Sequence, residues 1–436
     1  MHGDIETIKN KIHELVKEYV EIKFRKNDFV PAVNNVPVSG KVFDSDDINN
    51  IVDSALDGWF TTGRFNTEFE KDLAKYIGCK KVLTVNSGSS ANLLAFATLT
   101  DSELGDKAIQ PGDEVISVAA SFPTTINPLI QYGAIPVFVD VDIPTYNIDV
   151  IQIEAAITPK TKAIIIAHTL GNPFNVEEVS RIAKKNKLWL IEDCCDALGA
   201  RFNNTHVGNF GDIATLSFYP AHHITMGEGG AVFTNNAKLV KIIESFRDWG
   251  RDCWCASGCD NTCGKRFEWE LGDLPYGYDH KYIYSRIGYN LKITDMQAAL
   301  GLSQLKKLDG FVEARTRNHA LLKKGLQKHT DKLILPEATY GSIPSWFGFL
   351  ITLKKDIGID RKEMIRRLTE AKIDTRLLFA GDVRKQPFFK NCNYRSVGNL
   401  ENTEIVLHDT FWIGVTPMIN DAMIEHVITT FNDILN

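Results

Sequence analysis

Residues 217–230 read SFYPAHHITMGEGG, and the organisation of the whole chain can be worked out from them. An apolar run, Ile213 to Phe218, predicts a buried strand that leads into this stretch. A glycine-rich turn then leads to a second predicted strand, Gly230 to Thr234. Between the two stand His222 and His223, whose imidazoles can exchange a proton near neutral pH. The pattern therefore places two histidines just beyond the end of a buried strand.

Short apolar runs alternate with helical patterns over the preceding 140 residues. Further strands are predicted at Lys81–Val85, Glu114–Val118, Pro136–Val141, Ala163–His168 and Leu188–Asp193. Helical patterns lie between several of them, at Ala91–Leu99 and Val176–Lys185. This alternation predicts an α/β fold with a mostly parallel sheet covered by helices.

The sequence pattern divides the chain into three parts, and the strands predicted above fall in the second of them. Residues 1–40 predict an N-terminal helix, at 7–23, and an extended arm from Asn27 to Gly40. Residues 41–298 are expected to form the large domain, with an irregular cysteine-rich insert at 251–289. Residues 299–436 mix strand and helix patterns, and they predict a smaller α+β C-terminal domain.

Composition limits the class of protein. With 436 residues and a net charge of −6, the chain gives no reason to expect nucleic acid or an anionic membrane as a partner. The first twenty residues are charged throughout and lack an apolar signal core, so a cytoplasmic protein is expected. Its eight cysteines would then be free, metal-bound or catalytic, because thiols stay reduced in that compartment.

Two serine-containing segments at predicted strand ends are candidate phosphate sites. The turn with Gly88 and Ser89 opens a predicted helix, where backbone N–H groups can bind an anion. A Gly-Ser turn is also a common helix cap. Ser217 could add a second hydroxyl, or it could satisfy only local backbone groups.

Three other side chains have both a functional and an ordinary interpretation. Asp193 ends a predicted strand, where ligands gather in open parallel sheets, but it could simply cap a helix. Phe122 could stack on a flat ligand or belong to the core. Arg376 could bind a diphosphate through its guanidinium, or it could be a surface arginine.

The joint order of these motifs resembles the DegT/DnrJ/EryC1/StrS family of sugar-nucleotide aminotransferases. The resemblance includes the Gly-Ser turn, Ser121-Phe122, Asp193, the SFYPAHH strand and the segment GYNLKITDMQAA at 288–299. It implies a fold-type I transferase with pyridoxal phosphate, in which Asp193 keeps the ring nitrogen protonated. It also implies a homodimer, in which Asn290 reaches the phosphate of the neighbouring subunit. Asp196 stands where relatives often carry His or Gln beside the cofactor.

His222 occupies the position at which that family has its cofactor-binding lysine. An imidazole forms no stable Schiff base, so the expected cofactor is pyridoxamine phosphate, held without a covalent bond. His222 would instead act as a base, a task that suits histidine because the unperturbed pKa of an imidazole is about 6.5. The expected reaction is dehydration rather than amino transfer. The alternative is a polar residue in a catalytically dead homologue.

Four cysteines form a further candidate site: Cys195, Cys253, Cys255 and Cys263. Four thiolates suit a structural zinc ion or an iron–sulfur cluster, and spacing alone favours zinc. Buried thiols without a metal are a third interpretation. The spacing of these cysteines resembles that of one group of 3-dehydratases within the family, whose members carry a 2Fe-2S cluster at these four positions.

The resemblance to that branch implies a complete reaction. The substrate would be a CDP-4-keto-6-deoxyhexose, and the product a precursor of 3,6-dideoxysugars in lipopolysaccharide O-antigens. Two electrons would come through the cluster from an NADH-dependent flavin and iron–sulfur reductase. The alternatives are a cluster-free 3-dehydratase for GDP-4-keto-6-deoxymannose and a catalytically dead homologue that senses metal or redox state.

Overall fold

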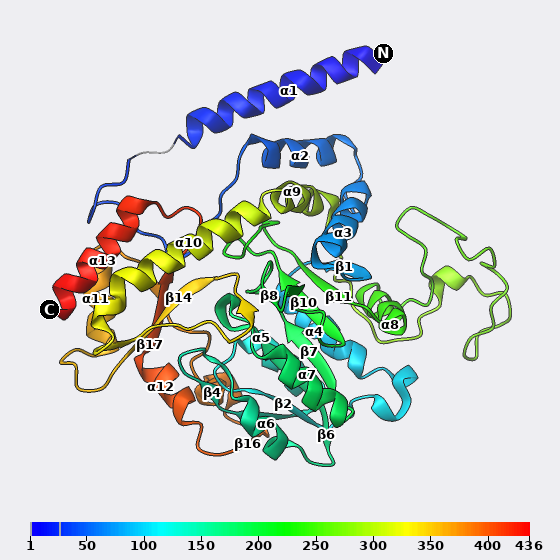
Figure 1. The fold of residues 1–436 in the computed structure, drawn as a ribbon. Helices are drawn as coiled ribbons and strands as arrows, with labels where there is room; N and C mark the ends of the chain where they lie inside the picture. The colour runs from blue at the N-terminus through cyan, green and yellow to red at the C-terminus, as the bar shows by residue number, and fades with distance from the viewer. Residues whose placement is uncertain (1, 26–27) are drawn as a thin grey trace.

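The computed structural model describes residues 2–25 and 28–436. Asn27, the predicted start of the arm, lies outside the described residues. A large twisted sheet occupies the centre, with helices on both faces, and a smaller sheet packs beside it near the C-terminus (Figure 1). Among the described helices, none has the length and apolar character needed to cross a membrane.

The large sheet confirms the predicted mostly parallel arrangement. Its neighbours β10, β7, β6, β2, β3 and β16 pair in parallel, and β11 pairs antiparallel with both β10 and β1. The strands lie in this spatial order: β1 (Lys81–Val85), β11 (Gly230–Thr234), β10 (Ile213–Ser217), β7 (Trp189–Asp193), β6 (Thr161–Ala167), β2 (Glu114–Val118), β3 (Ile135–Val139) and β16 (Arg395–Ser396). The carboxyl ends of β1, β10, β7 and β6 therefore meet at one edge.

Helix α4 is the central helix of this layer. It spans Gly88–Leu99, and its residues are apolar nearly all round, so it is buried against β10, β11 and α8. The other helices of this part are α2 (Ser45–Leu56), α3 (Arg64–Ile77), α5 (Pro123–Gln131), α6 (Val150–Ala156), α7 (Val176–Lys185) and α8 (Ala237–Arg247). Short strand pairs join β4 (Val141–Asp142) with β5 (Asn147–Ile148), and β8 (Arg201–Phe202) with both β9 (Thr205–His206) and β13 (Ser342–Ile343).

The smaller sheet is antiparallel and has its own hydrophobic core. Its order is β12 (Leu333–Ile334), β14 (Gly348–Leu353), β17 (Thr410–Gly414) and β15 (Thr375–Arg376). Five helices lie in this part of the chain or lead to it: α9 (Asp295–Leu305), α10 (Leu308–Leu326), α11 (Arg361–Glu370), α12 (Glu401–Asp409) and α13 (Asp421–Leu435). The predicted division at residue 298 stays a prediction, and β16 shows that contacts cross it.

Two segments stand off the body of the molecule (Figure 1). Helix α1 (His2–Lys23) lies across α2 at the N-terminal end. Residues 251–289 form the irregular insert that the sequence predicts, and a 3-10 turn at His280–Tyr282 is the regular element described within it. Without apolar periodicity, this insert has no face that could pack as a helix or strand.

Candidate active site

A cavity of about 450 Å³ opens at the carboxyl ends of β7 and β10. It lies between the large sheet and residues of the smaller sheet, including Phe347 and Trp412. The structure brings most of the predicted site residues to its wall: Gly88, Ser89, Phe122, Asp193, Asp196, Ser217, His222 and Arg376. Residues almost 290 positions apart therefore share one site.

The N-terminus of α4 forms one wall of the cavity and suits an anion. We call this wall, made by Gly88, Ser89 and Ser217, the cradle. Ser87 caps the helix by accepting a hydrogen bond from the Ser90 N–H at 3.0 Å, which leaves the exposed Ser89 free of the capping role. A Cβ atom on Gly88 would lie 2.5 Å from Ser217 Cβ. Only glycine therefore allows Ser217 to approach the helix terminus, and this arrangement fits a phosphate group.

Gly88→Ala is expected to weaken the binding of pyridoxal phosphate by about tenfold or more, because the new methyl group would occupy the cradle. Titration followed by cofactor absorbance measures the change. Gly310→Ala is the matched control, since a Cβ there meets no atom within 4 Å. Equal affinities for the two variants would contradict the assignment of the cradle.

Asp193 is buried at the end of β7 and held by hydrogen bonds on both oxygens. Oδ2 accepts from Asn92 Nδ2 and from Thr125 Oγ1, both at 2.8 Å. Oδ1 accepts from the Cys195 N–H at 3.1 Å and from Thr215 Oγ1 at 3.4 Å. These donors stabilise a carboxylate, and Asp193 also lines the cavity, so the group fits a protonated ring nitrogen.

Sequence reasoning missed the side chains that orient Asp193. Asn92 lies within the apolar run of α4, and Thr215 lies within the apolar strand β10. A polar residue within a buried apolar run needs a hydrogen-bond partner. The presence of Asn92 and Thr215 in such runs was therefore a signal that the sequence offered.

Phe122 and Arg376 lie on exposed parts of the cavity wall. Phe122 is 50% exposed, so it is not a core residue, and its ring meets Phe379 edge-on at 6.2 Å. Arg376, on β15, is exposed and lines the same cavity. The Arg376 Nη1 donates to the Thr375 carbonyl oxygen at 2.8 Å, and its guanidinium has further N–H groups for a diphosphate, while the Phe122 face is available to a flat ring.

His222 points into this cavity beside an acidic partner. Its Nδ1 lies 3.3 Å from Asp196 Oδ1, and its ring packs against Phe347 with centroids 5.2 Å apart. Among the described residues none makes a hydrogen bond to this buried Nδ1, and Asp196 places a carboxylate within ion-pair distance of it. The structure thus places Asp196 beside His222 as well as in the cavity wall.

Arg315 of α10 donates hydrogen bonds to the turn that carries His222, and sequence reasoning missed this residue too. Its Nη2 donates to the carbonyl oxygens of Ala221 and His222, at 3.3 and 3.4 Å, and its Nη1 donates to that of Phe347 at 3.1 Å. Burial lowers the pKa of Arg315 to about 10, and the nearby Asp196 opposes the shift. The guanidinium therefore stays charged at neutral pH and fixes the turn.

His223, whose role the sequence left open, is directed away from the cavity wall. Its Nε2 pairs with the Ser345 carbonyl oxygen at 2.9 Å. Burial, with the nearby Arg315 and His222, holds the pKa of His223 well below its usual value. The ring is therefore neutral, and it joins the turn to the smaller sheet.

Three of the four candidate metal ligands line a second, small cavity within the insert. Cys253, Cys255 and Cys263 share it with His280 and Lys281. Backbone N–H groups of Cys255, Thr262 and Lys265 donate to the three sulfur atoms at 3.3–3.4 Å. Burial raises the pKa of Cys255, but Thr262, Cys253 and Lys281 together bring it below its usual value. Such donors suit thiolates that bind a metal.

Two predicted site residues lie apart from the groups they were expected to join. Cys195 is separate from the other three candidate ligands, and Asn290 is not in the lining of the large cavity. Cys195 lines the large cavity and, among the described residues, is not part of the lining of the small one. Asn290 is exposed at the base of the insert, where its Oδ1 accepts from Lys292 Nζ at 3.0 Å. Its predicted contact with a neighbouring subunit stays a prediction.

A family model, the DegT/DnrJ/EryC1/StrS aminotransferase family, matches residues 42–432. The chain belongs to this family. The lipopolysaccharide biosynthesis protein RfbH of Salmonella typhimurium is 60% identical over 426 residues, which cover 98% of both chains. The dTDP-4-dehydro-2,6-dideoxy-D-glucose 3-dehydratase of Saccharopolyspora spinosa is 51% identical, over 92% of this chain and 86% of that protein.

A solved structure supports the same conclusion for the fold. The Escherichia coli GDP-4-keto-6-deoxy-D-mannose-3-dehydratase with bound hydrated pyridoxal phosphate aligns with a TM-score of 0.81 and 31% identity. The alignment covers 92% of this chain and the whole of the Escherichia coli chain. The predicted fold-type I transferase architecture and the predicted family are therefore confirmed.

Proposed function

We propose that this chain is a sugar-nucleotide 3-dehydratase that uses pyridoxamine phosphate and a 2Fe-2S cluster. The proposed substrate is a CDP-4-keto-6-deoxyhexose, on the route to 3,6-dideoxysugars of lipopolysaccharide O-antigens. One observation carries the proposal: His222, with its acidic partner Asp196, stands in the cofactor cavity where the family has a lysine. The names of the 60% and 51% identical relatives support the pathway and the reaction class.

The proposed binding roles follow from the chemistry of the cavity wall. The α4 terminus, Ser89 and Ser217 hold the cofactor phosphate. Asp193 holds the ring nitrogen in its protonated form, and Phe122 stacks on the ring. Arg376 binds the diphosphate of the sugar nucleotide.

His222 has the role of the base in this proposal. When bound, the cofactor would supply an amine for the keto group of the sugar and a conjugated ring that can accept electrons. His222 Nε2 accepts the proton released in the reaction, and Asp196 stabilises the resulting imidazolium at Nδ1. With no lysine at this position, the chain has no competing covalent bond to the cofactor there.

Four thiolates are the proposed ligands of the cluster: Cys195, Cys253, Cys255 and Cys263. Held by these residues, a cluster would provide one-electron chemistry for reduction of the dehydrated sugar. We propose that the electrons come from an NADH-dependent flavin and iron–sulfur reductase, and that the enzyme is a homodimer. Backbone hydrogen bonds to the three sulfur atoms of the insert support thiolate ligation.

Purification without oxygen tests the proposed cofactors directly. We expect a pyridoxamine absorption band together with cluster bands, and close to two iron and two sulfide per chain. Activity on a CDP-4-keto-6-deoxyhexose should then depend on an added reductase. Adding the corresponding GDP and dTDP sugars to the assay identifies the nucleotide.

Two outcomes would favour another function. Zinc in place of iron, with turnover that needs no reductase, would indicate a cluster-free 3-dehydratase of the GDP-sugar type. The position of Cys195 outside the small cavity is the observation that favours this second candidate. Failure to bind either cofactor would contradict both functions.

A further inference from the structure

The four proposed ligands of the cluster divide into two groups within one chain. Cys195 lies at the end of β7, and a Cβ added to Gly88 would lie 3.2 Å from its Sγ, so the sulfur borders the phosphate cradle. The other three thiols line the small cavity of the insert. A 2Fe-2S cluster takes four ligands, so neither group is sufficient alone.

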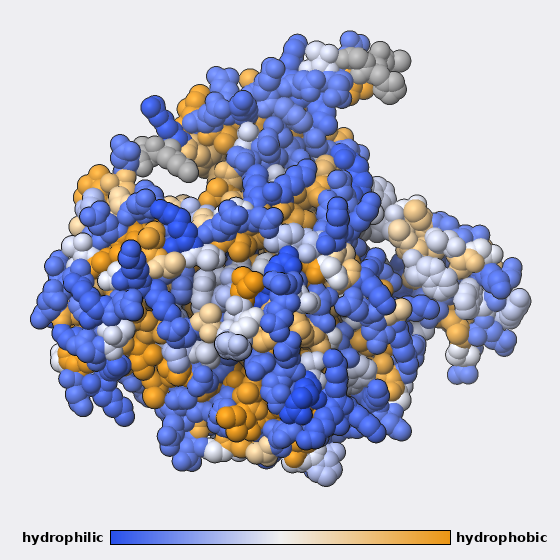
Figure 2. Space-filling view, in the orientation of Figure 1, coloured by the Kyte–Doolittle hydropathy of each residue, from blue (hydrophilic) through white to orange (hydrophobic). Residues whose placement is uncertain are grey.

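The insert projects away from the large cavity. Figure 1 shows its loop extending beyond α8, at the opposite side of that helix from the strands of the sheet. In the space-filling view the insert is a separate lobe with a notch between it and the body (Figure 2). The insert that carries these three cysteines thus extends away from the strands of its own chain.

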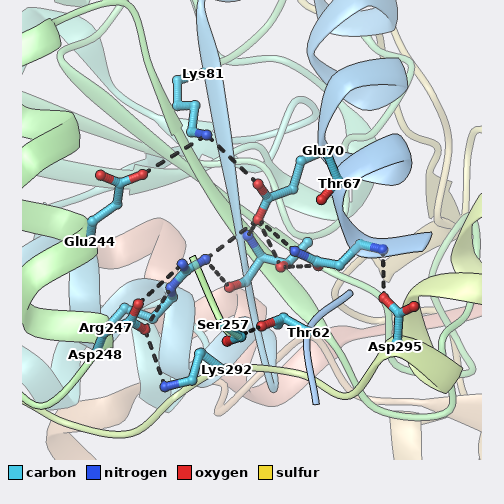
Figure 3. A network of polar contacts seen from close by, with 12 residues as sticks. Thr62, Thr67, Glu70, Lys81, Glu244, Arg247, Asp248, Ser257, Lys292 and Asp295 are labelled. Atoms are coloured by element: carbon cyan, nitrogen blue, oxygen red, sulfur yellow. Dashed lines mark hydrogen bonds and ion pairs between the residues drawn. The ribbon is translucent and has the colours of Figure 1, made fainter. Parts of the chain in front are cut away.

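Polar contacts hold the insert in this position. At its base, Asp248 pairs with Arg247 at 3.1 Å and with Lys292 at 3.4 Å (Figure 3). Farther along, Ser257 Oγ lies 3.0 Å from Thr62 Oγ1 (Figure 3), and Gly258 packs on the ring of Trp59. These contacts join the cysteine loop to the turn between α2 and α3, not to the cavity that contains Cys195.

The other end of the insert is fixed by a buried ion pair. Arg286 contacts Asp101, and their side chains are 8% and 5% exposed. Breaking such a pair leaves a buried charge without its partner, which is strongly destabilising. Moving the insert to the cavity of its own chain would strain this anchor as well as the contacts at Asp248 and Thr62.

The insert exposes large aromatic and aliphatic side chains among its charged residues. Several large side chains in it are more than half exposed: Trp254, Phe267, Tyr276, Tyr282, Tyr284 and Ile287. Aromatic residues of this kind are enriched where proteins associate. The surface that carries the three thiols is thus suited to contact another protein surface.

We propose that the cysteine site is completed between two copies of this chain. Cys195 of one copy and Cys253, Cys255 and Cys263 of the other would hold one cluster, and the dimer would hold two. This inference rests on the proposed function, since it concerns the ligands of the proposed cluster. It places the cluster beside the cofactor cavity, because Cys195 lines that cavity.

Mixed dimers test the inference through metal content rather than activity. Cys195→Ser and Cys255→Ser chains carry different affinity tags, are expressed together, and are purified over both tags. Ligands from two copies leave one intact site in this mixed dimer, because both substitutions fall on the other site. We expect about half of the iron and sulfide of the parent dimer. The Cys195→Ser homodimer and the Cys255→Ser homodimer should each hold little iron.

A second mixed dimer provides the control. Cys259 is exposed in the same insert and lines neither cavity, so Cys195→Ser paired with Cys259→Ser should also hold half of the iron. This control shows that a dimer with one broken site still loads the other.

Three results would overturn the inference. The first is a Cys195→Ser/Cys255→Ser dimer without iron while the parent and the control are loaded, which would place all four ligands in one chain. The second is failure of the tagged chains to co-purify. The third is full iron in the Cys195→Ser homodimer, which would make His280 the candidate fourth ligand, since its Nδ1 lies 3.9 Å from Cys263 Sγ. A parent protein without iron would instead overturn the proposed cluster itself.

Discussion

His222→Lys is expected to bind pyridoxal phosphate covalently and to lose dehydration by about 10²–10⁴-fold, the usual contribution of a positioned base. The lysine amine can react with the aldehyde of the cofactor, whereas the imidazole cannot. The substitution also removes the imidazole that lies beside Asp196 in the cavity. Mass spectrometry after borohydride reduction measures attachment, and product formation with the reductase measures turnover.

His222→Asn separates the two effects of that substitution. Asparagine removes the base without providing an amine, so turnover should fall as far while the cofactor stays unattached. His223→Asn is the matched control, because His223 bonds the Ser345 carbonyl oxygen and does not line the large cavity. It should lower the melting temperature and leave the turnover of the folded enzyme closer to the parent. A His222→Lys variant that dehydrates as well as the parent would show that the base is another residue.

Asp193→Asn is expected to lower turnover by about 10²–10³-fold, the usual effect of removing a group aimed at charge in a buried site. The amide cannot hold a proton on the ring nitrogen. Its NH₂ group would also face donors, since Asn92 and Thr125 both donate to Oδ2 at 2.8 Å. Turnover at saturating cofactor and the absorption maximum of the bound cofactor measure the change.

Thr125→Val is the graded control for Asp193. It removes one hydrogen bond to the carboxylate and keeps the charge, so the expected loss in turnover is about tenfold. A loss for Thr125→Val as large as that for Asp193→Asn would indicate that the site is sensitive to any disturbance. The carboxylate would then have no special relation to the ring.

Local sequence pattern predicted the layers of the fold well. The apolar runs for β1, β2 and β11 match the strands residue for residue, as does the helical pattern for α7. These patterns reflect burial, because a strand in a sheet that helices cover on both faces is apolar on both of its sides. Errors fell at element ends, such as β3, which covers Ile135–Val139 rather than 136–141.

Contacts between distant segments could not be predicted in this way. Asp196 was expected beside the cofactor, but its closeness to His222 depends on how the turn after β10 lies against the segment after β7. Arg315 comes from a helix more than 90 residues beyond the turn that it fixes. No periodicity in either segment records the other, so only packing reveals these pairs.

The sequence by itself determined the parallel sheet, the glycine cradle, the strand-end Asp193 and the replacement of a lysine by His222, because each depends on a short segment. The tertiary structure decided which side chains orient those groups, and it separated Cys195 from Cys253, Cys255 and Cys263. The spacing of cysteines along the chain carries no information about the path of an irregular insert between them. That path is set by the ion pairs at Asp248 and Arg286 and by packing on Trp59, which exist only in the folded chain.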